Sequence, residues 1–316
     1  MILITGGLGY LGGRLAEQLL QVGYLEIALG TSRVNADVPH ELRKCRIINI
    51  DLLDDVSLDK ACKGIKIIIH LAALNAQACA RDPEKALMIN GLGTLKLLQA
   101  AIRQGVSKLI YFSTAHVYGS PLIGEINEKT LPRPVHPYAI THRLAEDYVI
   151  EESRKGNIEG VVLRLSNAVG APLDSSVNCW MLLVNDLCRQ AVQDNELVLH
   201  SSGLQQRDFI SIGDVAKVVG LMVDMHQGRN SEEIYNLGSG KSISVIEVAR
   251  LVVERYKNQS GISIEIKVNN ETAIIETTKL EYQIGKISSV VCFGNKTTLE
   301  QDIDKTLEFC GREFSG

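Results

Sequence analysis

The sequence predicts an α/β protein, with a doubly wound parallel sheet followed by a smaller C-terminal α/β domain. Short runs rich in β-branched residues alternate with longer segments whose apolar residues recur every three or four positions. Alternation of strand and helix predicts a parallel sheet with helices on both faces. The chain has 316 residues, 45% of them hydrophobic and 22% charged. That length accommodates one large or two modest domains.

The first half of the chain carries the expected sheet. We expect strands buried on both faces at residues 2–5, 26–30, 46–50, 66–70, 108–113 and 160–165, with helices over 11–22, 84–103 and 139–155. After about residue 166 the pattern loosens. There we expect helices over 179–194, 213–226, 244–257 and 298–310, and strands at 197–200 and 263–268. The first domain is expected to cover 1–166 plus about 207–235, and the second about 167–206 and 236–316.

Composition narrows the class of protein. The net charge is −4, with no basic tail, which argues against nucleic acid or an anionic membrane as a partner. The seven cysteines are scattered without a C-x-x-C pair, which suits a reducing compartment and predicts neither disulfides nor a metal site. No apolar run approaches the ~20 residues of a membrane span. The chain opens directly on a strand, so we expect no signal peptide and a soluble, cytoplasmic protein.

A glycine-rich loop follows the first expected strand. In "ITGGLGYLGG", Gly6, Gly9 and Gly12 are spaced by two residues and lead into a helix. Such glycines let the backbone turn tightly, approach a pyrophosphate and present helix N-terminal N–H groups to it. The strand–turn–helix context therefore predicts a Rossmann-type dinucleotide site.

The end of the second strand indicates which dinucleotide is bound. NAD-binding versions carry an acidic residue ~20 positions after the loop, bonded to the ribose 2′-hydroxyl. Here the sequence reads "GTSR", so Thr31, Ser32 and Arg33 replace the acid. An arginine can form charge-assisted bonds to a 2′-phosphate. NADP(H) is therefore favoured over NAD(H), the alternative being that Arg33 is only a solvated loop residue.

Motifs along nearly the whole chain carry a family resemblance. They are "TGGLGYLG", "IDLLD", "IIHLAA", "INGLGTLKLLQAA", "YFSTAHVYG", "HPYAITH", "RLSNAVGAP", "QRDFISIGDVAK" and "IYNLGSGKSISV". Together they resemble the extended short-chain dehydrogenases/reductases, in particular the sugar-nucleotide epimerase/dehydratase family. The resemblance implies an enzyme with an N-terminal Rossmann domain and a C-terminal domain for a nucleoside-diphosphate sugar. It also implies a homodimer formed through the helices near 84–103 and 139–155.

The resemblance also assigns binding residues. It implies dinucleotide contacts from Gly6, Gly9, Tyr10, Leu11, Gly12, Asp51, Leu52, Leu71, Ala72, Ala73, Tyr138 and His142, with Asp51 and Leu52 beside the adenine. Asn167 and Arg207 match positions that contact the diphosphate of the sugar nucleotide. Arg207 suits that role as a bidentate phosphate partner, and the alternative is a salt bridge with a neighbour such as Asp208.

Thr114 and Tyr138 match the catalytic residues of the family. The resemblance implies that they flank the sugar hydroxyl or ketone that exchanges hydride with the nicotinamide. Tyr138 would carry the proton, and Thr114 would orient the oxygen.

Position 142 departs from the family pattern, because His142 stands where the family carries a lysine. That lysine bonds the nicotinamide ribose and lowers the tyrosine pKa by its charge. Imidazole can still reach the ribose but is only partly charged at neutral pH, with a reference pKa of ~6.5 against ~10.4 for lysine. We therefore expect Tyr138 to titrate nearer its reference value of ~10, which favours ketone reduction over alcohol oxidation. The competing hypothesis is a site impaired in both directions.

A second departure follows the catalytic threonine. Where related 4,6-dehydratases carry Asp and Glu, this chain has Ala115 and His116. Loss of the acid argues against dehydration. His116 could remove a proton beside a C4 ketone and permit epimerisation at C3 or C5, or it could only shape the sugar pocket. His136, just before a proline, is assigned no role.

These observations favour an NADP(H)-dependent oxidoreductase on a nucleotide-activated sugar, most simply a 4-keto-sugar reductase in deoxysugar or surface-glycan precursor synthesis. The alternatives are a sugar-nucleotide epimerase, at C4 or at C3/C5 through His116, and a non-catalytic dinucleotide sensor. The nucleotide base should depend on C-terminal residues such as Asn178, Trp180 and Asn185.

Overall fold

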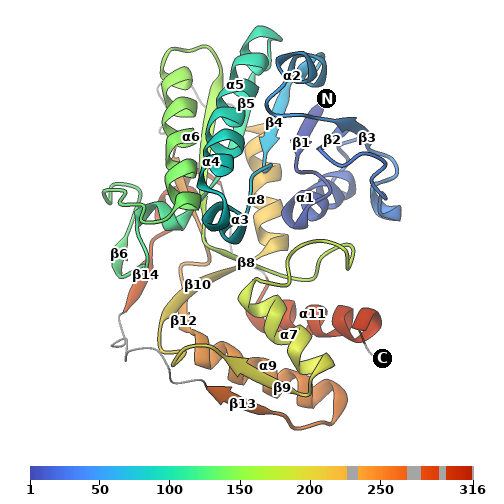
Figure 1. Cartoon of the computed structure of the whole chain (residues 1–316), viewed down its shortest axis with the longest axis vertical. Coiled ribbons are helices and arrows are strands. Elements are labelled where there is room, and N and C mark those ends of the chain that lie inside the picture. The colour runs from blue at the N-terminus through green and yellow to red at the C-terminus, as the bar shows by residue number, and fades with distance from the viewer. Residues whose placement is uncertain (226–233, 269–278, 292–296, 315–316) are drawn as a thin grey trace. The chain divides into compact units, whose positions relative to one another are not determined.

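The computed structural model describes residues 1–225, 234–268, 279–291 and 297–314 (Figure 1). The chain forms two compact units, each built from separate stretches of sequence. Unit 1 comprises Met1–Ser120, Glu128–Leu165 and Ala216–Asn236, and unit 2 comprises Pro121–Asn127, Ser166–Val215 and Leu237–Gly316. The second unit therefore interleaves with the first along the sequence.

Unit 1 is organised around a seven-stranded sheet of order β11-β7-β5-β4-β1-β2-β3. The strands are β1 (Ile2–Thr5), β2 (Ile27–Thr31), β3 (Arg46–Asn49), β4 (Ile67–His70), β5 (Lys108–Thr114), β7 (Glu159–Leu165) and β11 (Ile234–Leu237). Neighbouring pairs from β3 to β7 are parallel. The predicted α/β class is confirmed. Strand order reverses between β1 and β4, and open parallel sheets bind ligands at the carboxyl ends beside such a reversal.

One strand differs from the expectation of burial on both faces. β3 is exposed or half-buried along its length, and Ile47 is 40% exposed. The reason is its place at the edge of the sheet, where it has a neighbour on one side only. Burial in a strand depends on such tertiary neighbours, so an apolar run alone does not reveal an edge.

The helices of unit 1 are α1 (Tyr10–Gln21), α2 (Asp55–Cys62), α3 (Ala76–Arg81), α4 (Pro83–Ala86), α5 (Gly93–Arg103), α6 (Pro137–Arg154) and most of α8 (Ile212–Asp224). The expected helix over 84–103 is interrupted by a π-helical turn, Leu87–Leu92. Such turns are rare and recur at functional sites. Of the expected helix over 213–226, residue 226 lies outside the described residues.

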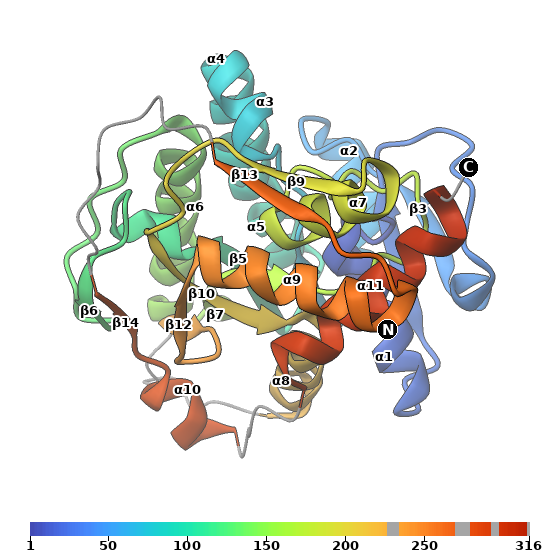
Figure 2. The ribbon, with the colours of Figure 1, turned by 90° about the horizontal axis from the view of Figure 1, so that it is seen from below.

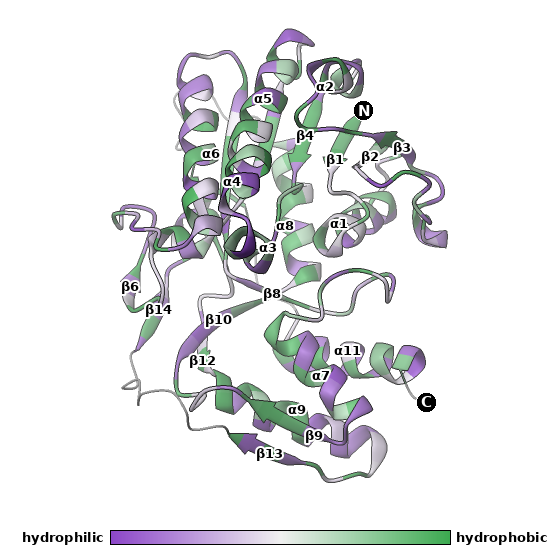
Figure 3. Cartoon of the chain, in the orientation of Figure 1, coloured by the Kyte–Doolittle hydropathy of each residue, from purple (hydrophilic) through white to green (hydrophobic). Residues whose placement is uncertain are grey.

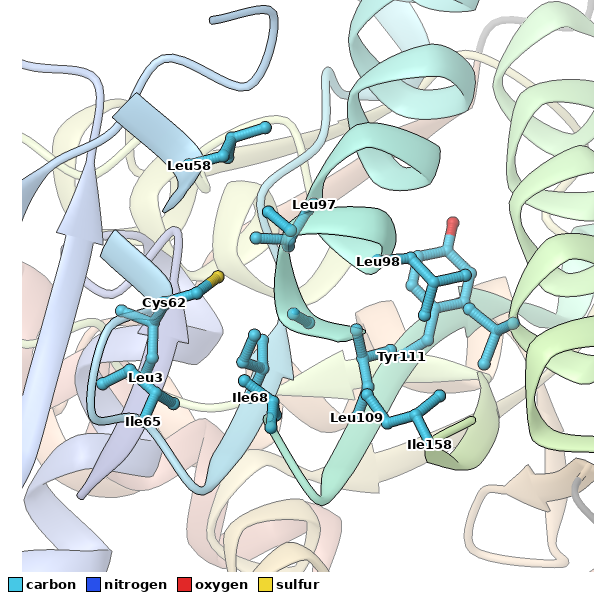
Figure 4. Close-up of a cluster of buried hydrophobic side chains, with 14 of the residues drawn as sticks. Leu3, Leu58, Cys62, Ile65, Ile68, Leu97, Leu98, Leu109, Tyr111 and Ile158 are labelled. Atoms are coloured by element: carbon cyan, nitrogen blue, oxygen red, sulfur yellow. The ribbon is translucent and has the colours of Figure 1, made fainter. Parts of the chain in front are cut away.

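A continuous apolar core joins one face of the sheet to the helices that cover it. Leu3, Ile68 and Leu109 from three adjacent strands pack with Leu97 and Leu98 of α5 (Figure 4). Figure 3 shows the same pattern, with hydrophobic strands inside and mixed polarity on the helices. Tyr111 of β5 extends into this core and is 2% exposed.

The described residues of unit 2 form three small sheets and three long helices. The sheets are β12-β10-β8, β13-β9 and β14-β6. Their strands are β6 (Gly124–Ile126), β8 (Asn167–Val169), β9 (Glu196–Leu199), β10 (Gln206–Ser211), β12 (Ser242–Ser244), β13 (Glu265–Val268) and β14 (Leu280–Tyr282). The helices α7 (Leu183–Gln193), α9 (Val245–Ser260) and α11 (Leu299–Phe314) enclose a second apolar core, and the paired β9 and β13 run beside them (Figure 2). A short helix, α10 (Gly285–Val290), follows β14.

Candidate functional site

The glycine loop between β1 and α1 forms a tight turn. Gly6 has φ +66°, a left-handed conformation that favours glycine, and its carbonyl accepts from the N–H of Gly9 at 2.9 Å. A Cβ on Gly12 would lie 2.3 Å from the Gly6 carbonyl oxygen. The first turn of α1 contains no acidic residue and receives no side-chain cap. The helix N-terminus therefore offers its N–H groups and partial positive charge to an anion.

A trough of about 630 Å³ lies beside this loop, within the size range of small-molecule sites. Nine of the predicted cofactor residues line it: Gly6, Gly9, Thr31, Ser32, Arg33, Asp51, Leu52, Ala72 and Ala73. Residues that the motif analysis did not assign also line it: Thr5, Leu8, Gly30, Asn49, Ile50, Leu74, Lys85 and Ile89. Lys85 comes from α4, which no phosphate motif marks. The trough thus brings together loop, strand and helix residues that are far apart in sequence.

Six predicted cofactor residues do not line the trough: Tyr10, Leu11, Gly12, Leu71, Tyr138 and His142. Gly12 instead lets α1 pack against the glycine loop, as its clashing Cβ position shows. The N–H groups of Leu71 and Ala72 each donate to Thr5 Oγ1 at 3.2 Å. Through these bonds the loop after β4 is held against the end of β1.

Hydrogen bonds within the chain already hold several polar groups at one end of the trough in place. Thr31 Oγ1 accepts from the N–H of Arg33 at 3.1 Å. Asp51 Oδ1 accepts from the N–H of Leu53 at 2.8 Å, and Ser57 Oγ accepts from the Asp51 N–H at 3.0 Å. Two cationic side chains, Arg33 and Lys85, therefore share the trough with one carboxylate whose oxygen is already engaged.

Asn90 connects the trough to the helix that carries Tyr138. From the π-helical turn, its Oδ1 accepts from the N–H of Leu74 at 2.7 Å, and its Nδ2 donates to Thr141 Oγ1 of α6 at 3.2 Å. Asn90 is 1% exposed. Sequence reasoning missed this residue, although the helix-weakening "ING" inside an apolar pattern was the available signal.

Thr114 and Tyr138 meet where β5 ends and α6 begins. Thr114 is the last residue of β5, and its Oγ1 accepts from the N–H of His116 at 3.2 Å. Burial raises the pKa of Tyr138 to about 12, and a hydrogen bond with the Thr114 side chain opposes part of that rise. Tyr138 therefore keeps its proton at neutral pH, even more firmly than the reference value of ~10 implies.

His142 lies one helical turn after Tyr138, and the two rings meet edge-on with centroids 4.4 Å apart. His142 is 4% exposed, its Nδ1 lies 2.7 Å from the Tyr111 hydroxyl, and its Nε2 has no hydrogen-bond partner among the described residues. Burial, with a smaller contribution from His70, lowers its pKa to about 3. The expectation of a partly charged imidazole is therefore wrong, because desolvation makes the ring uncharged at neutral pH.

A second buried histidine, His70, stands at the end of β4. Its Nδ1 lies 2.6 Å from Thr5 Oγ1 and its Nε2 lies 3.0 Å from Thr94 Oγ1. The Thr94 hydroxyl donates its own proton to the carbonyl of Asn90 at 2.6 Å, so it can only accept from His70 Nε2–H. Burial lowers the pKa of His70 to about 4. His70 is a neutral residue that supports the floor of the trough.

His116 and His136 lie together beside Tyr138. Their ring centroids are 5.6 Å apart, and the His136 ring stacks near Tyr138 with centroids 6.1 Å apart. His136 caps α6, since its Nδ1 accepts from the N–H of Ala139 at 3.3 Å. No role for His136 was expected from the sequence, and in the structure it is the N-cap of the helix that carries Tyr138 and His142.

Asn167 and Arg207 belong to unit 2, on the adjacent strands β8 and β10. The Asn167 amide donates to the carbonyl of Asp208 at 2.8 Å. The alternative salt bridge between Arg207 and Asp208 is not formed. Successive strand residues point to opposite faces, and the Asp208 carboxylate instead accepts from Ser166 and Ser239. Burial lowers the pKa of Arg207, which has no ion pair among the described residues.

Two of the C-terminal residues expected to select the base are committed to internal contacts. Asn185 is fully buried and its amide donates to the carbonyl of Gly170 at 3.2 Å. The Trp180 indole donates to the carbonyl of Ser175 at 3.1 Å, and its ring packs against Phe309 and Phe314 of α11. Their first role is therefore to hold unit 2 together.

The fold and the trough are those of a dinucleotide-binding α/β protein. The trough, Thr114, Tyr138 and His142 all fall within the segment that matches the model of the NAD dependent epimerase/dehydratase family, residues 2–238. The chain belongs to this family and is an NAD(P)-dependent enzyme of the extended short-chain dehydrogenase/reductase type. Membership favours an enzyme over the non-catalytic sensor.

Known proteins of this family resemble the chain along most of its length. UDP-glucose 4-epimerase 1 of Oryza sativa is 28% identical over 298 residues, covering 84% of this chain and 82% of that protein. The structure of Thermus thermophilus UDP-glucose 4-epimerase with NAD has a TM-score of 0.82 at 25% identity, covering 99% of each chain. The structure of RMD from Pseudomonas aeruginosa with NADPH has a TM-score of 0.78 at 24% identity, covering 98% of this chain and 99% of that one.

Within the described ranges, no group of three or more His, Cys, Asp or Glu side chains is arranged to hold a metal ion. None of the helices in those same ranges combines the length and apolar character of a membrane span.

Proposed function

We propose that the protein is an NADP(H)-dependent oxidoreductase that reduces a 4-keto sugar nucleotide during synthesis of deoxysugar or surface-glycan precursors. The observation that carries the proposal is His142, a buried and uncharged ring next to Tyr138 at the position of the family lysine. Without a fixed positive charge beside it, tyrosinate is not stabilised. The site therefore holds Tyr138 as an acid.

Tyr138 and Thr114 have distinct roles in reduction of the ketone. The dinucleotide, when bound, supplies the hydride. Tyr138 holds the proton that the ketone oxygen needs, and Thr114, hydrogen-bonded to it, orients that oxygen. Oxidation would require Tyr138 as a base, and a pKa of about 12 makes that form scarce at neutral pH.

The trough supports NADP(H) as the cofactor. Thr31, Ser32 and Arg33 line it at the end of β2, where an NAD site would present a carboxylate. The guanidinium of Arg33 suits the 2′-phosphate, while the glycine loop and the N-terminus of α1 suit the pyrophosphate. The vacant Nε2 of His142 is the atom that would reach a ribose hydroxyl.

Unit 2 supports a nucleoside-diphosphate sugar as the substrate. Arg207 is a half-buried guanidinium on β10 with no ion pair among the described residues, so its charge is available to a diphosphate. Asn167 stands directly opposite Phe209 on the neighbouring strand. The known structures of the fold include complexes with UDP-glucose and UDP-glucuronic acid.

An epimerase is the second candidate, and the names of the relatives favour it. Several of the curated relatives are 4-epimerases. A C4-epimerase would oxidise and re-reduce its sugar with a cofactor that stays bound. A C3/C5-epimerase would need a base near the ketone, and the pair of His116 and His136 could supply it. Stoichiometric bound NAD+ with turnover in the absence of added cofactor would favour the C4-epimerase.

We also infer that the chain forms a homodimer through α6 and the π-helical turn, which contact each other. Their outer faces expose Leu87 (50%), Met88 (43%) and Ile140 (49%), a concentration of apolar side chains that a second copy would cover. Light scattering tests this: the wild type should be a dimer, and Ile140→Glu should be a monomer. A monomeric wild type contradicts the inference.

The test of the proposed reaction is NADPH consumption with 4-keto-6-deoxy sugars linked to UDP, GDP, dTDP and CDP. We expect turnover with at least one of them. Tyr138→Phe should reduce turnover by about 10²–10⁴-fold in a protein that still binds NADPH, because it removes the proton donor. Absence of NADPH consumption across the panel would contradict the reductase.

A further inference from the structure

We propose that Tyr111 is a positioning residue that holds His142 in the tautomer with its proton on Nε2, so that Nε2–H donates to a ribose hydroxyl of the bound dinucleotide. The inference rests on the proposed function only for the identity of that acceptor. It gives a role to a residue inside the apolar core (Figure 4), which neither the motifs nor the family position of His142 indicates.

The contact itself is short and shielded from water. Tyr111 Oη and His142 Nδ1 are 2.7 Å apart, with Tyr111 2% exposed and His142 4% exposed. The Tyr111 hydroxyl has no other hydrogen-bond partner among the described residues. A buried hydroxyl without an acceptor is strongly disfavoured, so its proton must point at Nδ1.

The protonation states of the two groups agree with this arrangement. Burial, aided by Glu146, raises the pKa of Tyr111 well above its usual value, so the phenol keeps its proton. The imidazole is uncharged, and its Nδ1 accepts a bond only when that nitrogen carries no proton. The single ring proton therefore sits on Nε2.

The tautomer with its proton on Nδ1 is disfavoured at both ring nitrogens. Nδ1–H would donate to the Tyr111 oxygen and leave the phenol proton without an acceptor among the described residues. Nε2 would then be a bare acceptor, whereas the ammonium of the family lysine offers only donors. With Tyr111 in place, the neutral ring presents a hydrogen-bond donor at Nε2, as the lysine would, but carries no positive charge.

The vacant Nε2 supports a ligand as its partner. It is a buried nitrogen without a hydrogen-bond partner in the described structure, and it lies beside Tyr138, near the expected reacting atoms. Buried polar atoms of this kind are rare and call for a partner. A ribose hydroxyl of the dinucleotide would satisfy it.

A double-mutant comparison separates positioning from packing. We expect Tyr111→Phe to weaken NADPH binding about threefold to tenfold in a fluorescence titration, the effect of losing one oriented hydrogen bond. In a His142→Lys background the same substitution should change nothing, because an ammonium has no tautomer to fix. Tyr118→Phe is the matched control. It deletes another buried hydroxyl with a 2.7 Å bond, to Asn236, and should leave NADPH binding unchanged. Equal losses in both backgrounds, or no loss with His142 present, overturn the proposal.

Imidazole 15N NMR of the ligand-free wild type reports the tautomer directly. We expect a protonated, pyrrole-type Nε2 and a bare, pyridine-type Nδ1 at His142, becoming a mixture in Tyr111→Phe. The reverse assignment in the wild type overturns the proposal even if the variant fails to fold. Neither readout uses a sugar nucleotide, so a failure of the reductase assignment leaves this test standing.

Discussion

The rings of His142 and Tyr138 meet edge-on with centroids 4.4 Å apart, and no cation is among the groups that shift the pKa of either residue. Burial disfavours the charged form of each side chain. It raises the pKa of the Tyr138 phenol to about 12 and lowers the pKa of the His142 imidazole to about 3. At neutral pH the pair is therefore uncharged.

Restoring the lysine should move the site toward oxidation. In His142→Lys, the ammonium stabilises tyrosinate, and an adjacent opposite charge lowers a pKa by about 1–3 units. The pH–rate profile for alcohol oxidation should move to lower pH by that amount, with a roughly tenfold gain at neutral pH for each unit.

His142→Gln is the control for this change, because glutamine keeps a donor and adds no charge. Its oxidation profile should stay where the wild-type profile lies. A His142→Lys enzyme that gains reduction relative to oxidation would refute the charge argument.

Arg33 should determine the choice between the dinucleotides. Arg33→Ser removes a charge-assisted partner of the 2′-phosphate, an interaction of about 1.5–3 kcal/mol, so NADPH affinity should fall about tenfold to a hundredfold. NADH affinity should hardly change. Arg43→Ser, at an exposed residue outside the trough, is the control in the same calorimetric titration. Tighter binding of NADH than NADPH by the wild type would contradict the cofactor proposal.

Gly12 should be intolerant of any side chain. In Gly12→Ala the new Cβ would lie 2.3 Å from the Gly6 carbonyl oxygen, so α1 must move away from the loop that holds the pyrophosphate. We expect loss of dinucleotide binding with a lower melting temperature. Gly311→Ala in α11 is the matched control, since its Cβ meets nothing within 4 Å and alanine favours the helix by about 1 kcal/mol. Normal NADPH binding by Gly12→Ala would show that the loop can adjust.

The two buried histidines should make the fold sensitive to acid. Their pKa values are lowered to about 4 for His70 and about 3 for His142, against ~6.5 in the unfolded chain. The unfolded state therefore binds more protons below that pH. Their contribution to stability is complete above pH ~6.5 and is lost as the pH falls toward the folded values, by up to about 1.4 kcal/mol per pH unit for each ring.

Urea unfolding between pH 7.5 and 5 measures this slope. His70→Asn should flatten it, because asparagine does not titrate. An unchanged slope in that variant would show that His70 is already accessible to protons in the folded state.

Much of the fold followed from local patterns. The apolar runs of β1, β4, β5 and β7 and the helical periodicities of α1 and α6 are visible without any tertiary information. The exposed edge strand β3 and the π-helical turn before α5 were not. Both depend on neighbours: β3 has a partner on one side only, and Gly91 allows close approach of Leu144 from α6.

Some residues of the candidate site could likewise be found from the sequence, and others only from the structure. Gly6, Gly9, Thr31 and Arg33 were found from spacing, because a phosphate-binding turn is encoded locally, and they do line one trough. The roles of Thr114, Tyr138, Asn167 and Arg207 came from the family resemblance and remain predictions. Lys85 lies outside the motifs, and Asn90 lies within "INGLGTLKLLQAA" without an assigned role, so their places at the trough were found only in the folded chain.

The sequence by itself therefore determined the α/β class, the dinucleotide loop and the pairing of Tyr138 with His142. Tertiary structure alone decided that His142 is uncharged, that Tyr111 is its partner and that His136 begins their helix. The physical reason is that spacing places side chains on the same helical face, whereas charge and tautomer depend on desolvation and on partners from distant strands. Tyr111, 31 positions before His142 in the sequence, is such a partner.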